Sequence, residues 1–243
     1  MKNQLGFANF LQNVDGVGLF LLVMMTVMSV ATWYLIVTKS WQNRQMRKHA
    51  KRFLDYFWEA PDLDAVAKRL KQDPPRDPFS HLAHHGFRAI AQHDGKTSLR
   101  LIEAGSQEEF LTRALRRAIE QDTARLENGL TVLASVGSSA PFVGLFGTVW
   151  GVYHALVSIG MSGQSTLDKV AGPVGEALIM TALGLAVAIP AVLAYNFFTR
   201  TNRLVLSELD GFAHDLFAFM STGTRVQESS ADGKVRPLAR KGA

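Results

Sequence analysis

The sequence predicts an all-α membrane protein with three transmembrane helices and long cytoplasmic helical extensions. Three observations lead to this fold class. The chain of 243 residues contains three long runs without Asp, Glu, Lys or Arg, and about 20 such residues span the roughly 30 Å of bilayer hydrocarbon as a helix. The basic residues lie between these runs. Outside them, apolar residues recur at helical spacing, for example in residues 106–128 and 204–220.

The first run, residues 16–37, is interpreted as an uncleaved transmembrane helix. It ends in Trp33 and Tyr34, and Lys39 follows. Aromatic residues followed by a cation are typical of a membrane–water interface. A signal peptide would instead have a shorter apolar core and a cleavage site with small residues after it.

The second run lies between Glu127 and Asp168 and contains SVGSSAPFVGLFGTVWGVYHA at residues 135–155. Alternating steps of four and three residues select small side chains on one helical face, namely Gly137, Pro141, Gly144, Thr148, Gly151 and Ala155. A small face lets neighbouring membrane helices approach closely, which is its more common role. It can also border a narrow hydrated path, and Thr148 keeps that second interpretation open.

The third run, residues 177–199, places Thr181 on a similar small face with Gly184, Ala188 and Ala191. Counting residues from the ends of the spans puts Thr148 and Thr181 at a similar depth, in the outer half of the bilayer. Two threonines at one depth on two small faces suggest a shared surface. Alternatively, each hydroxyl only bonds a carbonyl one turn back in its own helix.

Glu176 is the carboxylate at the edge of this third span. It lies five residues before Thr181, so its side chain points about 140° away from the threonine around the helix. Glu176 therefore need not share the threonine face, and it can also be a residue that reaches the interface.

The Lys and Arg residues indicate the orientation. There is 1 before the first span, 17 in residues 38–128, 1 in residues 158–176 and 7 from residue 200 onward. Because basic loops stay on the cytoplasmic side, the N-terminus is predicted outside and the C-terminus inside.

The composition excludes some kinds of site. The chain has no cysteine, which excludes disulfides and thiolate metal sites. His81, His84 and His85 have no carboxylate or cysteine near them in the sequence, so a solvated or packing role is favoured over metal binding. No phosphate loop or nucleophile elbow is present, so we expect no enzyme and no cofactor. The net charge of +5 is spread between apolar spans, which argues against nucleic acid as a partner.

The runs APFVGLFGTVWGVYHAL and GPVGEALIMTALGLAVAIPAVLAYN resemble the MotA/TolQ/ExbB proton-channel family, over residues 135–203. Within it the ExbB branch is the most similar. The resemblance implies a homopentamer in the bacterial inner membrane that encloses transmembrane helices of an ExbD-like partner. It also implies that proton flow drives TonB to energise outer-membrane import of iron–siderophore, haem or vitamin B12 cargo. By motif position, Thr148 and Thr181 would line the lumen facing a membrane carboxylate of ExbD, and Glu176 would flank the path.

The resemblance gives the predicted segments their compartments, in chain order: a periplasmic N-terminus (1–13), transmembrane helix 1 (14–38), a cytoplasmic helical segment (39–128), transmembrane helix 2 (129–157), a periplasmic loop (158–176), transmembrane helix 3 (177–199), and a cytoplasmic helix with a disordered tail (200–243).

Other functions stay open. A TolQ-like subunit of the Tol-Pal envelope motor shares the GLFGTVWG and EAL motifs. The sequences of the segments SAPFVGLFG and DKVAGPVGEAL favour ExbB. A flagellar stator fits less well. A non-conducting helical scaffold would use the small faces for packing alone, among membrane lipid.

The spans also lack a proton carrier. No Asp, Glu or Lys lies in residues 129–157 or 177–199, and threonine cannot gain and lose a proton near neutral pH. His154 is too close to the outer end to replace one. We therefore expect the missing titratable group to come from a partner helix.

Overall fold

The structure is a computed structural model that describes residues 15–94, 107–162 and 167–222. Within these ranges all regular secondary structure is α-helical, in the elements α2 (Gly16–Glu59), α3 (Leu63–Gln72), α4 (Pro78–Asp94), α5 (Gln107–Glu127), α6 (Leu130–Ser162) and α7 (Leu167–Thr222). The predicted all-α fold class is confirmed. The N-terminal segment and the tail predicted to be disordered lie outside the described residues.

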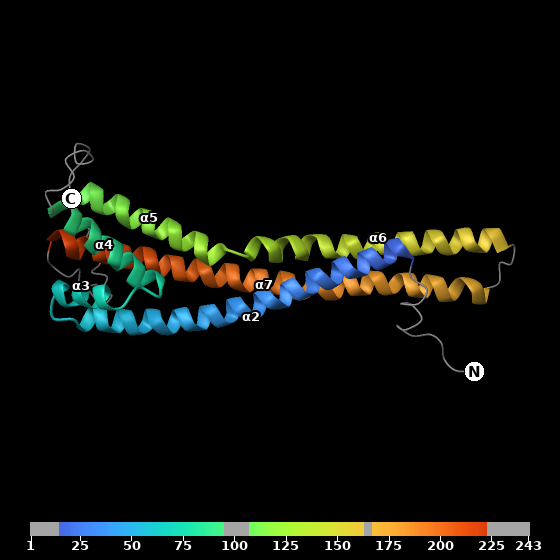
Figure 1. The fold of residues 1–243 in the computed structure, drawn as a ribbon, viewed down its shortest axis with the longest axis horizontal. Helices are drawn as coiled ribbons and strands as arrows, with labels where there is room; N and C mark the ends of the chain where they lie inside the picture. The colour runs from blue at the N-terminus through green and yellow to red at the C-terminus, as the bar shows by residue number, and fades with distance from the viewer. Residues whose placement is uncertain (1–14, 95–106, 163–166, 223–243) are drawn as a thin grey trace, which may run out of the picture.

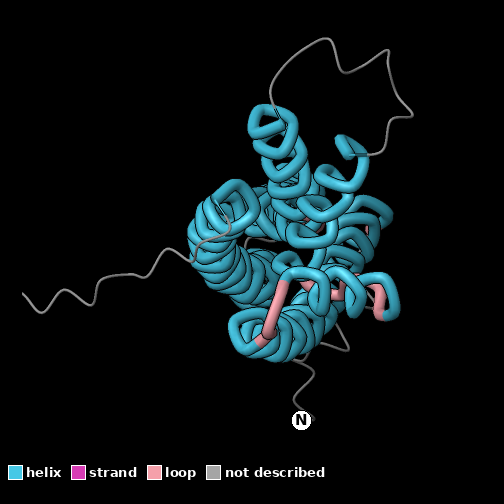
Figure 2. Tube along the Cα trace, turned by 90° about the vertical axis from the view of Figure 1, so that its left-hand side faces the viewer, coloured by secondary structure: helices cyan, strands magenta, loops and turns pink. Residues whose placement is uncertain are grey.

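The molecule is elongated and has two halves (Figure 1). In one half α6 and α7 run side by side as a hairpin, and α2 crosses them obliquely. In the other half α3, α4 and α5 gather around the C-terminal parts of α2 and α7. Viewed along the long axis, these helices form one bundle (Figure 2).

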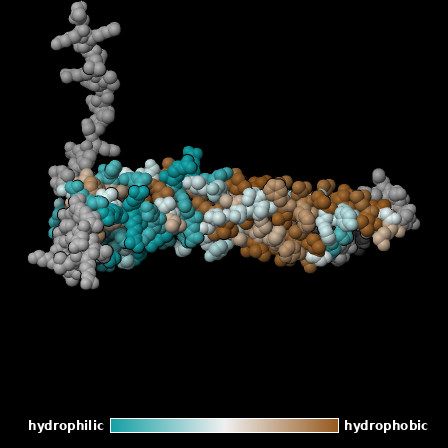
Figure 3. All heavy atoms as spheres, turned by 90° about the horizontal axis from the view of Figure 1, so that it is seen from above, coloured by the Kyte–Doolittle hydropathy of each residue, from teal (hydrophilic) through white to brown (hydrophobic). Residues whose placement is uncertain are grey.

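Three helical stretches are long and apolar enough to cross a membrane, Gly16–Glu59, Glu108–Met161 and Ala177–Ser221. On the face seen in Figure 3, apolar residues cover most of the half that contains the α6–α7 hairpin, and hydrophilic residues cover most of the other half. Many large apolar side chains are exposed there, including Leu19, Phe20, Val23, Phe142, Leu145, Phe146, Val149, Leu185, Ile189 and Leu193. An apolar surface of this extent calls for lipid or other protein to cover it.

The hydrophilic half has its own apolar core between α2, α3, α4, α5 and α7. Phe57 of α2 and Phe212 of α7 stand at its centre with ring centroids 5.1 Å apart. The buried side chains around them include Ala50, Val66, Leu70, Phe79, Leu82, Leu111, Leu115, Leu209 and Leu216. Helices α2 and α7 therefore both continue from the apolar half into this bundle without interruption.

The helix before the second span does not run straight into it, because α5 and α6 are separated by a turn at Asn128 and Gly129. Gly129 has φ +82, a conformation that favours glycine. The carbonyl of Leu126 at the end of α5 accepts hydrogen bonds from Lys39 Nζ at 3.0 Å and Asn202 Nδ2 at 2.8 Å. These donors from α2 and α7 satisfy a carbonyl that the helix end leaves free.

Gly129→Ala is expected to destabilise the protein, because the left-handed conformation costs a non-glycine residue about 1–2 kcal/mol. The new Cβ would also lie 3.1 Å from Leu35 Cδ2. We expect a lower melting temperature in detergent, and tryptophan fluorescence is used to monitor the unfolding. Gly211→Ala in α7 is the control, since nothing lies within 4 Å of its added Cβ. Equal melting of the two variants would contradict a role for this turn.

Candidate functional site

The small faces of α6 and α7 pack against each other with their backbones in contact. A Cβ added to Gly144 would lie 2.6 Å from the Met180 carbonyl oxygen and 3.1 Å from Gly184 Cα. A Cβ added to Gly184 would lie 2.7 Å from the Ala140 carbonyl oxygen. Neither glycine has room for even a methyl group, so these two residues set how closely the helices approach.

Gly137 and Gly151 of the α6 small face also lie along this contact. A Cβ on Gly137 would lie 2.6 Å from Val192 Cγ2, and one on Gly151 would lie 3.0 Å from Ala177 Cβ. Ala188 is buried in the apolar cluster between α2, α6 and α7. Pro141 is half-buried inside α6, and the helix continues through it.

Gly147 belongs to the same contact although the stripe counted from the sequence leaves it out. It is buried, and an added Cβ would lie 2.9 Å from Met180 Cε. The signal that could have found it is its spacing from Gly144, because residues three apart also share a helical face.

The two threonines meet between α6 and α7. The hydroxyl oxygens of Thr148 and Thr181 are in hydrogen-bonding contact, and both residues are half-buried. Thr148 Oγ1 also lies 3.1 Å from the carbonyl oxygen of Gly144 and 3.2 Å from that of Ala177. A hydroxyl has one proton to donate, so Thr181 can donate to Thr148 while Thr148 donates to one of these carbonyls.

This arrangement combines the two interpretations that the sequence left open. The contact with Gly144 is the bond to the preceding turn of the same helix, and the contacts with Ala177 and Thr181 join α6 to α7. The pair places polar oxygen atoms inside an otherwise apolar helix contact, where they can also bond water or a carboxylate. Glu176 lies in α7, and its side chain lies outside what the structure describes.

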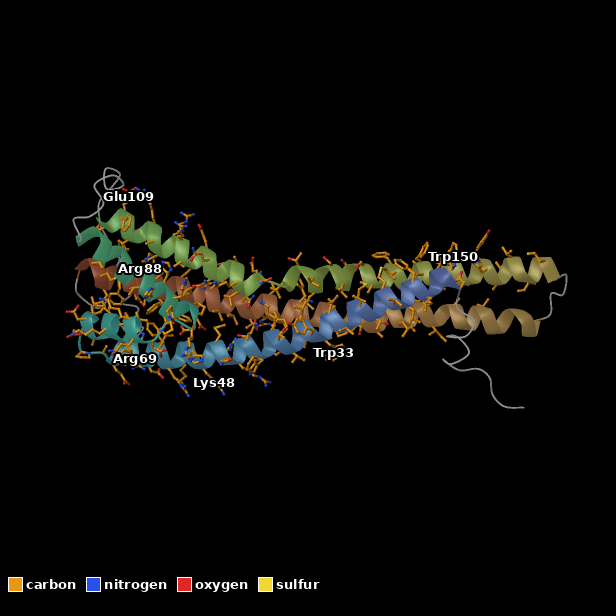
Figure 4. The ribbon with its side chains drawn as sticks, viewed as in Figure 1. Trp33, Lys48, Arg69, Arg88, Glu109 and Trp150 are labelled. Atoms are coloured by element: carbon orange, nitrogen blue, oxygen red, sulfur yellow. The ribbon has the colours of Figure 1, made fainter. Side chains whose placement is uncertain are left out.

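A second polar contact, which the sequence reasoning missed, joins the start of α2 to the C-terminal half of α6. Asp15 caps α2, since its Oδ1 accepts a bond from the Gly18 amide at 2.8 Å. Its Oδ2 accepts a bond from Trp150 Nε1 at 2.6 Å, and His154 Nε2 lies 4.0 Å away. Figure 4 shows Trp150 beside the first turn of α2. An Asp just before an apolar run signals a helix cap, but nothing in the sequence pairs it with a residue 135 positions away.

The histidine cluster on α4 has a carboxylate beside it that is distant in the sequence. Asp122 of α5 accepts a hydrogen bond from His81 Nδ1 at 2.9 Å. Among the described residues no three His, Cys, Asp or Glu side chains are arranged to hold a metal ion. Burial, together with the positive charges of His81 and Arg88, lowers the pKa of His84 and His85.

Known proteins resemble this chain over most of its length. The model of the MotA/TolQ/ExbB proton channel family matches residues 78–210, which extends the resemblance beyond residues 135–203 into α4 and α5. A protein of Xanthomonas campestris pv. campestris named biopolymer transport protein ExbB is 42% identical over 93% of this chain and 92% of its own length. Its namesake from Neisseria meningitidis is 42% identical over 82% and 89%. A Tol-Pal system protein TolQ from Pseudomonas aeruginosa is 34% identical over 82% and 86%.

Proposed function

The chain belongs to the MotA/TolQ/ExbB proton channel family, and from this premise we propose that it is the ExbB-like subunit of an inner-membrane complex that energises import through TonB. In this proposal the complex uses the proton motive force to drive uptake of iron–siderophore, haem or vitamin B12 cargo across the outer membrane. The higher identity to the proteins named ExbB than to TolQ supports this choice.

The proposed topology follows the distribution of basic residues. The N-terminus lies in the periplasm, and the bundle of α3, α4 and α5 lies in the cytoplasm together with the C-terminus. The hydrophilic surface of that half supports this placement (Figure 3). Residues 158–176 form the periplasmic end of the hairpin, in which α6 and α7 continue as helices on either side of residues 163–166.

The proposed proton path runs along the contact between the threonines. Thr148 and Thr181 are proposed to face the lumen of a homopentamer and to hold water or a carboxylate there, with Glu176 beside the path. The observation that carries the proposal is that two hydroxyls meet inside a span that has no Asp, Glu or Lys. A hydroxyl can pass a proton on but cannot store one at neutral pH, so an ExbD-like partner is proposed to supply the titratable carboxylate.

Proton flux is expected only when the partner is present. Moving one charge through the membrane potential yields about 2.3 kcal/mol per 100 mV, provided that something carries it across the middle. The measurement is voltage-driven proton flux into liposomes that contain the purified chain, alone or with its partner. Flux that vanishes when the partner's membrane carboxylate is neutralised would support the proposal. Robust flux from this chain alone would overturn the need for a partner.

A TolQ-like role is the second candidate, because a protein named TolQ is 34% identical over most of the chain. The two candidates differ in their partners, so a mild-detergent pull-down from the native membrane separates them. Recovery of ExbD and TonB supports the proposed function, and recovery of TolR and TolA replaces it with the Tol-Pal role. Recovery of neither would favour a helical scaffold without conduction.

A further inference from the structure

Three side chains form a continuous hydrogen-bonded chain between α4 and α5, which we name the histidine relay: Asp122, His81 and His85. His81 Nδ1 lies 2.9 Å from Asp122 Oδ2, and His85 Nε2 lies 3.2 Å from His81 Nε2. The relay is part of the hydrophilic half of the molecule, well away from the threonine pair.

The hydrogen bonds assign the protons in the relay. A carboxylate only accepts, so the Nδ1–H of His81 donates to Asp122. The Nε2 of a neutral His81 is then an acceptor, and the Nε2–H of His85 donates to it. In this state one proton lies between the two facing Nε2 atoms, and each of the two contacts has one donor and one acceptor.

Asp122 is buried, the two histidines are half-buried, and the surroundings of the relay are mostly cationic. The side chain of Asp122 is 4% exposed and that of His81 is 12% exposed. On α4 itself, the charges of His84 and Arg88 act on the His85 ring. A cavity of about 400 Å³ opens beside His81 and Asp122, and its other charged or titratable lining groups are Lys39 and His49 of α2, Arg76 and Asp77 before α4, and Arg125 of α5. Helix α7 contributes only the uncharged Phe198 and Asn202 to this lining.

Proton counting gives the relay two steps. With one added proton both hydrogen bonds of the relay can be kept, because one ring still donates to the Asp122 carboxylate and the other presents a free Nε2 by holding its proton on Nδ1. The second added proton leaves two Nε2–H groups facing each other at 3.2 Å with no acceptor between them. Two like charges then stand in a partly desolvated site that has cations around it, which is strongly unfavourable.

We propose that the histidine relay is a pH switch that holds α4 against α5 above about pH 6.5, the ordinary pKa of histidine, and releases them when the surrounding solution acidifies. The switch reads the pH of the compartment that contains this bundle, which is the cytoplasm if the proposed topology holds. The release itself depends only on the geometry of the three side chains and on the charges around them.

The sign of the effect follows from the folded-state protonation. Burial lowers the pKa of His85, with further lowering from the charges of His81, His84 and Arg88, and Asp122 opposes them. A histidine with a lowered folded-state pKa stabilises the closed bundle above its ordinary pKa of about 6.5, and this stability is lost as the pH falls through the folded-state pKa.

The test is hydrogen exchange of the full chain in detergent, between pH 8 and pH 5 and corrected for intrinsic rates. The amides of α4 and α5 around His81 and Asp122 are expected to lose protection by up to about tenfold per pH unit below pH 6.5. The amides of α6 serve as the internal reference. Constant protection of α4 and α5 over this range would overturn the proposal.

Two variants separate the relay from a general effect of acid. His85→Gln keeps a donor opposite His81 Nε2 but cannot be charged, so its protection should fall much less steeply below pH 6.5 and retain only the smaller contribution of His84, whereas the control His214→Gln on α7 should behave like the wild type. Asp122→Asn removes the anion that accommodates the first proton, so α4 and α5 should lose their protection at a higher pH than in the wild type. If both His85→Gln and Asp122→Asn lose the protection of α4 and α5 at the same pH and as steeply as the wild type, other groups cause the opening. The proton-flux experiment is independent of this result, so the two proposals can fail separately.

Discussion

Thr148→Val and Thr181→Val are each expected to abolish energised uptake while leaving the protein folded and inserted. Valine keeps the volume of threonine and removes the hydroxyl, which is the only group on these side chains that can hold water or a carboxylate. The lost hydrogen bond should cost only about 1 kcal/mol of stability. The expected damage is therefore to function, because the two hydroxyls contact each other at the centre of the α6–α7 contact.

The measurement is growth on, or accumulation of, a TonB-dependent cargo in cells whose own subunit has been deleted. Thr148→Ser is expected to restore uptake because it retains the hydroxyl. The matched control is Thr26→Val in α2, where an exposed hydroxyl bonds only the Leu22 carbonyl at 2.8 Å. Normal uptake by both valine variants would show that Thr148 and Thr181 only pack the helices, and the lumen assignment would fail.

Gly144→Ala is expected to force α6 and α7 apart. Its new Cβ would stand 2.6 Å from the Met180 carbonyl oxygen, and a backbone atom cannot move aside as the end of a flexible side chain can. Overpacking of this kind costs about 1–3 kcal/mol or more. Gly184→Ala meets the Ala140 carbonyl in the same way, and Gly144→Leu should be worse than either alanine.

Native mass spectrometry and a melting curve in the same detergent measure this effect. We expect fewer complete oligomers and a lower melting temperature for Gly144→Ala and Gly184→Ala. Gly160→Ala, also in α6, is the control because nothing lies within 4 Å of its added Cβ. If the two test variants match this control in both measurements, the tight approach of the helices at Gly144 is not needed for assembly.

The parts of the fold that the sequence predicted well depend on local chemistry. The three spans follow from the length and hydropathy of single runs of residues. The contact between Thr148 and Thr181 follows from two local facts, helical spacing and depth in the membrane, since antiparallel helices that share a small face bring residues of equal depth together.

What the sequence did not predict depends on contacts between distant segments. The interruption at Gly129 is stabilised by Lys39 and Asn202, which come from two other helices. No carboxylate lies near His81 in the sequence, because its partner Asp122 is 41 residues away and approaches only when α4 packs on α5. A periodic pattern identifies which face of a helix is buried, but not which distant side chain meets it.

Helix α7 has 56 residues in one unbroken stretch, which at 1.5 Å per residue makes a rod of about 84 Å. Its N-terminal part carries Thr181, and its C-terminal part carries Leu209 and Leu216 in the core of the hydrophilic bundle. Such a rod acts as a lever arm, and a tilt of about 5° at one end displaces the other by roughly 7 Å. From Thr181 to Leu216 the lever is about 52 Å long, so the same tilt at the threonine contact displaces the core of the hydrophilic bundle by roughly 5 Å, close to one helical turn.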